Sequence, residues 1–107
     1  FVLSSPESHG TMSGVMKNSL DWLSFDQTSG KIFAFISTLG GQPNTTTLNH
    51  MRVVARWIHG ISIPEQIVIA KVKSAFDDEG NLVDEDIKKR VDKFTDSIIK
   101  HVEKLRG

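Results

Sequence analysis

A nearly continuous apolar run, from Lys31 to Ser37, constrains the fold of this chain more than any other feature. Runs of this kind are typical of strands buried on both faces of a parallel sheet, whereas a half-exposed strand alternates apolar and polar residues. Two further apolar segments, 1–3 and 66–70, are expected to be strands of the same sheet. The sequence therefore predicts an interior strand that lies between helical layers.

Three segments with helical spacing of apolar residues follow the three strands in turn. We expect helices over about 13–25, from 45–47 to His59, and from near Asp84 onward. In the last helix, acidic residues come first and basic residues last, as the helix dipole favours. The residues expected to be buried are Val15, Met16, Ser19, Leu20 and Leu23 in the first helix, Leu48, Met51, Ala55 and Ile58 in the second, and Ile87, Val91, Phe94, Ile98, Val102 and Leu105 in the third.

The alternation of strands and helices predicts right-handed crossovers and a parallel α/β sheet. With 107 residues the chain forms one domain at most. Pro64 is expected to precede the paired part of the third strand, because proline has no N–H for the ladder.

Two polar loops that contain glycine, Pro6–Thr11 and Thr38–Asn44, leave the carboxyl ends of strands that are expected to be adjacent. Open parallel sheets bind ligands at this edge. Gly10, Gly40 and Gly41 would let a flat heterocycle lie close to the backbone. The alternative is that these glycines only form strand-to-helix turns, and spacing alone does not decide between the two.

Composition excludes several classes of function. Thirteen basic and thirteen acidic side chains balance, so no overall field attracts nucleic acid or an anionic membrane. Cysteine is absent, which excludes disulfides and thiolate metal sites and fits a reducing cytoplasm. No apolar run reaches the roughly 18 residues of a membrane span. We expect a soluble, cytoplasmic protein with small-molecule or protein partners, and no metal site, because no histidine pair has metal-ligand spacing supported by a third ligand.

Residues 5–23, S-P-E-S-H-G-T-M-S-G-V-M-K-N-S-L-D-W-L, resemble the flavin-contacting segment of the NADPH-dependent FMN reductase family. This family includes flavodoxin-like quinone, chromate and azo-dye reductases. The runs G-K-I-F-A-F-I-S-T-L-G-G at 30–41 and L-N-H-M-R-V-V-A-R at 48–56 are also similar to family sequences. The resemblance implies a flavodoxin-like three-layer sandwich, FMN and NADPH as cofactors, and a quinone, azo compound, metal oxyanion or flavin as the small-molecule electron acceptor.

The same resemblance implies a set of site residues. In the family, a P-E-Y-N or P-E-Y-H loop packs against the isoalloxazine ring and ribityl chain, and a later glycine-bearing segment lies by the pyrimidine edge. Ser8 stands where the family usually has tyrosine, so an aromatic wall is lost. No catalytic acid, base or nucleophile is implied. The implied cofactor-binding residues are Pro6, Glu7, Ser8, His9, Gly10, Ser37, Thr38, Gly40 and Gly41.

In the family, the flavin phosphate is held by a G-S-x-R-x-x-S-like loop after the first strand, and residues 1–107 contain no such segment. We therefore expect residues 1–107 to be the C-terminal portion of a single flavodoxin-like FMN reductase domain. The strand at Phe1 to Ser5 is expected to pair with a separate chain carrying the missing N-terminal half, with a second copy in a homo-oligomer, or with upstream residues. The alternative function is a non-catalytic flavodoxin-like fragment that acts as a structural or association module.

Simpler roles are expected for a few other residues. His9 is taken as a polar loop residue with a backbone role, although it could donate a proton to a substrate. Trp22 and Trp57 are expected to be packing residues, and Arg52 and Arg56 to lie on a solvated helix face. His50, His59 and His101 are expected to be solvated helix residues.

Overall fold

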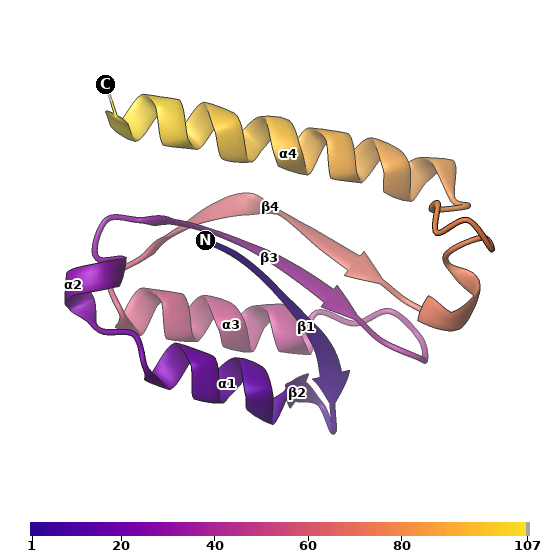
Figure 1. The fold of residues 1–107 in the computed structure, drawn as a ribbon, viewed down its shortest axis with the longest axis horizontal. Helices are drawn as coiled ribbons and strands as arrows, with labels where there is room; N and C mark the ends of the chain where they lie inside the picture. Colours follow the sequence, from indigo (N-terminus) through magenta and orange to yellow (C-terminus); the bar gives the residue numbers. More distant parts are fainter. Residues whose placement is uncertain (107) are drawn as a thin grey trace.

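The computed structural model describes residues 1–106 and shows one sheet between two helical layers (Figure 1). Figure 1 places α4 on one face of the sheet and α1 and α3 on the other, which confirms the flavodoxin-like three-layer α/β sandwich. The strands are β1 (Val2–Ser8), β2 (Thr11–Met12), β3 (Ile32–Thr38) and β4 (Ile61–Ile69). The helices are α1 (Gly14–Asp21), α2 (Phe25–Thr28), α3 (Thr46–Trp57), the short 3₁₀ helix η1 (Val72–Ser74) and α4 (Glu85–Arg106).

The sheet has the strand order β2-β1-β3-β4. β1, β3 and β4 run parallel, as the strand–helix alternation predicts. β2 is antiparallel to β1 and covers its outer edge only opposite Glu7 and Ser8. Sequence analysis missed β2, because a strand of two residues has no periodicity. Within residues 1–106, the outer edge of β1 from Val2 to Pro6 has no strand partner.

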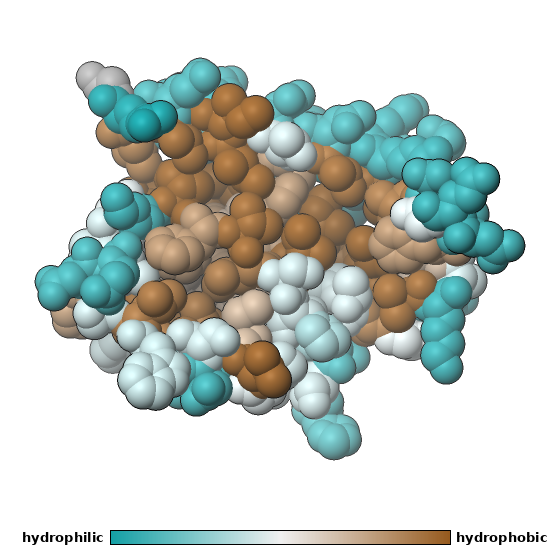
Figure 2. Space-filling model, viewed as in Figure 1, coloured by the Kyte–Doolittle hydropathy of each residue, from teal (hydrophilic) through white to brown (hydrophobic). Residues whose placement is uncertain are grey.

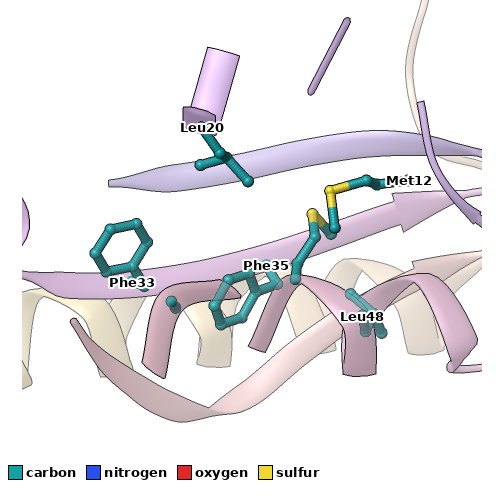
Figure 3. Packing of buried hydrophobic residues seen from close by; sticks show 7 residues of the cluster. Met12, Leu20, Phe33, Phe35 and Leu48 are labelled. Atoms are coloured by element: carbon teal, nitrogen blue, oxygen red, sulfur yellow. The ribbon is translucent and has the colours of Figure 1, made fainter. Parts of the chain in front are cut away.

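β3 is buried on both faces, as its continuous apolar run predicts. Its alternate side chains enter two separate cores. Phe33 and Phe35 pack in a cluster with residues of α1, β2 and α3, several of which are seen in Figure 3. Ile32 and Ala34 pack on the other face with residues of β4 and α4, including Phe94.

The first helix ends earlier than predicted. α1 stops at Asp21, and a separate short helix, α2, begins at Phe25 with a capping box between Ser24 and Gln27. The prediction of one helix to Phe25 was therefore wrong. Trp22 follows the end of α1 and is 83% exposed, so its expected packing role was wrong as well. Trp57 at the end of α3 is also exposed, so the same expectation was wrong for this residue.

Three other side chains expected to be buried are exposed: Val15, Ser19 and Leu105. Val15 of α1 is 79% exposed and lines a groove beside the free edge of β1. Leu105, in the last turn of α4, is 55% exposed. Val15 and Leu105 lie where the sheet no longer covers the helix. Hydrophobic periodicity therefore identifies the helix face that turns toward the sheet, but not how far along the helix the sheet extends.

β4 begins before Pro64, which contradicts the prediction that this proline precedes the paired segment. Ile61 and Ser62 already pair with β3. The register then shifts, and pairing resumes at Gln66. Pro64 lies within this irregularity, where the ladder requires no N–H from it.

Arg52 of α3 stabilises the irregular part of β4, so its expected place on a solvated face was wrong. Its Nη2 donates to the carbonyls of Ile63 at 2.9 Å and Pro64 at 3.2 Å, and its Nε donates to Gln66 Oε1 at 2.9 Å. The guanidinium also lies over the Phe35 ring, 5.2 Å from the ring centroid. Burial lowers the pKa of Arg52 from its usual value.

α4 starts where the sequence predicts. The Asp84 carboxylate accepts hydrogen bonds from the backbone N–H groups of Asp86 at 2.8 Å and Ile87 at 3.2 Å, which satisfies the first turn. Phe94, in the middle of the helix, is buried against the sheet. Among residues 1–106, no helix is long and apolar enough to cross a membrane.

Candidate functional site

A tight hairpin forms the first of the two loops at the carboxyl edge of the sheet. Ser8 pairs with Thr11, and the two residues between them have positive φ, 49° at His9 and 88° at Gly10. This pattern is typical of a two-residue type I′ turn, which matches the twist of the flanking strands. Gly10 therefore has a backbone role that the turn alone explains.

The second loop begins beside the first. Pro6 in β1 and Thr38 in β3 are register partners in the parallel sheet. The hairpin and the loop that follows β3 therefore leave the same edge from neighbouring strands. This is the juxtaposition that the predicted topology requires.

The loop after β3 is tied to the end of β4. The N–H of Leu39 donates to Ile69 O at 3.0 Å, the N–H of Val72 donates to Leu39 O at 3.1 Å, and the N–H of Lys71 donates to Gly41 O at 3.2 Å. Lys71 adopts a left-handed conformation with φ of 46° to make this connection. Backbone hydrogen bonds therefore set the position of the loop.

Gly40 and Gly41 are exposed in this loop, and neither has a positive φ. A Cβ built at either position would meet no atom within 4 Å. Neither chain conformation nor packing within residues 1–106 therefore requires glycine there. The open space above these two residues suits a ligand that approaches the backbone closely.

Hydroxyl groups lie beneath the edge. Ser5 Oγ donates to Pro6 O at 2.9 Å and accepts from the N–H of Ser13 at 3.0 Å. Ser13 Oγ in turn accepts from the N–H of Met16 at 3.1 Å and caps α1. Ser37 Oγ and Thr47 Oγ1 are buried without a hydrogen-bond partner in the described part of the chain.

The structure thus places the sequence-predicted residues along one edge, but at different depths. Pro6, Ser8 and His9 are exposed on the hairpin, and Glu7, Gly10 and Thr38 are half-buried. Gly40 and Gly41 are exposed on the second loop. Ser37 differs from the others, because it is fully buried and its hydroxyl lies below the open surface.

Sequence analysis missed a contact between the hairpin and α3. Thr11 Oγ1 lies 2.6 Å from His50 Nδ1. The two residues are 39 positions apart, and no local pattern pairs them. His50 is therefore more than a solvated helix residue, because it fixes the hairpin against α3.

A second missed cluster joins β4 to α4 on the other side of the sheet. Ser97 Oγ donates to Glu65 Oε2 at 2.5 Å, and His101 Nδ1 lies 2.7 Å from Ser97 O. The Ser97 hydrogen bond is the main cause of a lowered pKa at Glu65, and the nearby His101 and Lys93 contribute to it. His101 was expected to be solvated, but it is half-buried in this cluster.

No group of three or more His, Cys, Asp or Glu side chains in residues 1–106 is arranged to hold a metal ion. The chemical groups available at the carboxyl edge include backbone groups, hydroxyls, the imidazole of His9 and the carboxylate of Glu7.

An open, mostly parallel sheet with two converging loops at its carboxyl edge defines a flavodoxin-like α/β protein. A family model described as NADPH-dependent FMN reductase matches residues 1–74, and the chain belongs to this family.

Several curated proteins are similar to the chain. It is 39% identical over 83 residues to the NADPH-dependent FMN reductase ArsH of Rhizobium meliloti, which covers 73% of the chain and 34% of that protein. It is 36% identical over 104 residues to the FMN-dependent NADPH-azoreductase of Staphylococcus saprophyticus, covering 95% of the chain and 55% of the azoreductase. For the azoreductase of Staphylococcus aureus strain USA300, identity is 34% over 103 residues, with coverage of 94% and 55%. The chain therefore spans between one third and just over half the length of these relatives.

Proposed function

We propose that this chain is part of an FMN-dependent oxidoreductase that takes electrons from NADPH and passes them to a small-molecule acceptor. The pairing of Pro6 with Thr38 carries the proposal, because it brings the two loops to one ligand-binding edge. Membership of the NADPH-dependent FMN reductase family supports FMN and NADPH as the cofactors. The acceptor is proposed to be a quinone, azo compound, metal oxyanion or flavin. A cytoplasmic location is also part of the proposal, since a cysteine-free sequence suits a reducing compartment.

Two features of the edge support a flavin ring as its ligand. Gly40 and Gly41 present open space that a Cβ would occupy, and the type I′ turn at His9 and Gly10 leaves the same edge of the sheet from the neighbouring strand. When bound, FMN would supply the redox chemistry, while the chain binds and orients it. The residues proposed to hold the ring are Pro6, Glu7, Ser8, His9, Gly10, Ser37, Thr38, Gly40 and Gly41.

The loops are held in place before any ligand binds. The Thr11–His50 contact fixes the hairpin against α3, and the Lys71–Gly41 hydrogen bond ties the second loop to the end of β4. A preorganised site loses less conformational entropy on binding than a mobile one. These backbone and side-chain contacts therefore support a cradle that acts mainly through position.

We further propose that residues 1–107 are the C-terminal portion of one flavodoxin-like domain. The relatives are longer than this chain. A groove of about 540 Å³ runs between β1 and α1, lined by residues that include Leu3, Val15 and Leu20. Figure 2 shows apolar residues gathered between α4 and the α1/α3 layer. A strand and helix from the remainder of the domain would pair with β1 and cover this surface.

One observation favours the alternative, a structural or association module, for residues 1–107 taken alone. Helix N-termini commonly bind phosphate through free backbone N–H groups. The N-terminus of α1, which follows the hairpin directly, is capped by Ser13 Oγ. The flavin phosphate would therefore need groups from the rest of the domain.

A flavin titration tests the proposal. We expect Gly41→Val to weaken FMN binding to the purified protein, because the added side chain fills the space where the ring would lie. Gly14→Val is the matched control: Gly14 has equally open space and no positive φ, but it lies outside the two loops. Equal FMN affinity in the wild type and in both variants, measured by flavin fluorescence, would contradict the proposed cradle.

Riboflavin separates the phosphate contribution from that of the ring. For residues 1–107 alone, we expect FMN and riboflavin to bind with similar, weak affinity. For the protein that includes the remainder of the domain, FMN is expected to bind far more tightly. A strong FMN preference in residues 1–107 alone would show that this segment contains its own phosphate site.

A further inference from the structure

A pocket lies between β2, α1 and α3, and Thr11 at the end of the hairpin is part of its lining. Its volume is about 320 Å³, within the range of small-molecule sites. Met12, which belongs to the core cluster seen in Figure 3, forms part of its wall together with Val53 and Val54. The remaining lining residues are Thr11, Lys17 and His50. The pocket is therefore apolar over most of its wall and polar on the rest.

Each of the three polar lining residues already has an interaction partner. Thr11 Oγ1 and His50 Nδ1 are 2.6 Å apart, which holds the imidazole ring in one orientation. Lys17 Nζ lies 2.7 Å from Asp21 Oδ1, and both side chains are more than half exposed. An exposed ion pair of this kind contributes little to stability, so Lys17 can exchange its carboxylate partner at small cost.

We propose that this pocket binds a small aromatic anion, a flat ring that carries one carboxylate or sulfonate group. The ring would lie against Met12, Val53 and Val54, and the anionic group would take the place of Asp21 beside Lys17. The six lining residues of the described chain include one ammonium group and no carboxylate, which favours an anion over a cation. The imidazole of His50 and the hydroxyl of Thr11 add hydrogen-bonding groups to the lining of the pocket.

This inference does not depend on flavin binding. The pocket shares only the hairpin with the proposed flavin site, and none of its lining residues belongs to the nine proposed for the ring. Binding of the anion and binding of FMN can therefore be measured separately in one sample. If the protein binds no FMN, binding of the anion can still be measured, and the reverse also holds.

Benzenesulfonate and the N,N,N-trimethylanilinium cation, which have the same ring and opposite charges, are suitable probes. The readout is the NMR shift of the Val53 and Val54 methyl groups during titration of the purified protein. We expect saturable shifts with benzenesulfonate and much weaker ones with the cation. Equal responses to the two probes, or no saturable shift with either, would overturn the proposal.

Two substitutions on α1 should act in opposite directions. Lys17→Met is expected to weaken benzenesulfonate binding about two- to five-fold, the size of an exposed ion pair. Asp21→Asn is expected to strengthen binding, because it removes the competing carboxylate. A purely structural role for the Lys17–Asp21 pair would move both variants in the same direction or move neither.

The matched controls lie on α4. Lys88 forms a similar exposed pair with Glu85, at 3.1 Å, far from the pocket in the sequence. Lys88→Met and Glu85→Gln should leave benzenesulfonate binding unchanged. If the Val53 and Val54 methyl groups instead shift with protein concentration in the absence of probe, a second copy of the chain occupies the pocket and the proposal is wrong.

Discussion

Ser5 and Ser37 lie side by side as register partners on β1 and β3, and both side chains are fully buried. Ser5 Oγ has two hydrogen-bond partners, Pro6 O and the N–H of Ser13. Ser37 Oγ has none in the described part of the chain. The Ser5 hydroxyl therefore stabilises the fold, whereas the Ser37 hydroxyl is a desolvated group without a hydrogen-bond partner in the described part of the chain.

This difference predicts opposite effects on stability. Ser5→Ala should lower the free energy of unfolding by about 1–3 kcal/mol, because the N–H of Ser13 loses its acceptor. Ser37→Ala should leave it unchanged or raise it, because an unsatisfied buried hydroxyl is removed. Urea unfolding of the two variants measures both. If Ser37→Ala destabilises as much as Ser5→Ala, Ser37 Oγ has a partner such as a buried water.

Glycine substitutions should separate chain conformation from ligand approach. Gly10→Ala should destabilise the protein by about 1 kcal/mol, because φ of 88° is unfavourable for an L-residue. Gly40→Ala should leave stability unchanged, since its Cβ meets nothing within 4 Å. Thermal unfolding measures the two effects. Equal destabilisation would show that the second loop also requires glycine for its own conformation.

The Glu65–Ser97 hydrogen bond predicts a pH dependence. The pKa of Glu65 is lowered in the folded protein, first by the Ser97 hydroxyl, so the unfolded state binds a proton more readily. The resulting stabilisation is fully present above the unfolded pKa and is lost as the pH falls through the folded pKa. Glu65→Gln should therefore unfold more easily than the wild type near neutral pH, and the difference should shrink in acid. A difference between the two proteins that is independent of pH would contradict this role.

The free edge of β1 predicts association of residues 1–107. An unpaired strand edge beside an apolar groove favours pairing with another chain. Val2→Lys should reduce the mass measured by light scattering, because it places a charge on this edge. Val83→Lys is the control, since Val2 and Val83 are both 54% exposed and Val83 lies outside the sheet. A monomeric wild type at working concentration would contradict the association.

The elements predicted well are those whose signal is local. The apolar run around Phe33 and Phe35 indicates a strand buried on both faces, and the Asp84 cap marks the start of α4. β2 was missed because two residues carry no period, and the extent of β4 because the irregularity at Pro64 depends on Arg52 from another element. Val15 was misplaced because α1 extends past the covered part of the sheet.

The sequence by itself determined the alternation of strands and helices, and with it the edge at which the loops after β1 and β3 emerge. Hydrophobic periodicity and chain direction act over a few residues and are legible without coordinates. Only the tertiary structure decided that Pro6 pairs with Thr38, that Thr11 meets His50, and that Ser37 lacks the partners that Ser5 has. The first two relationships depend on register and helix packing, which join residues more than thirty positions apart, and the third depends on how the chain turns after β1. None of the three leaves a local pattern in the sequence.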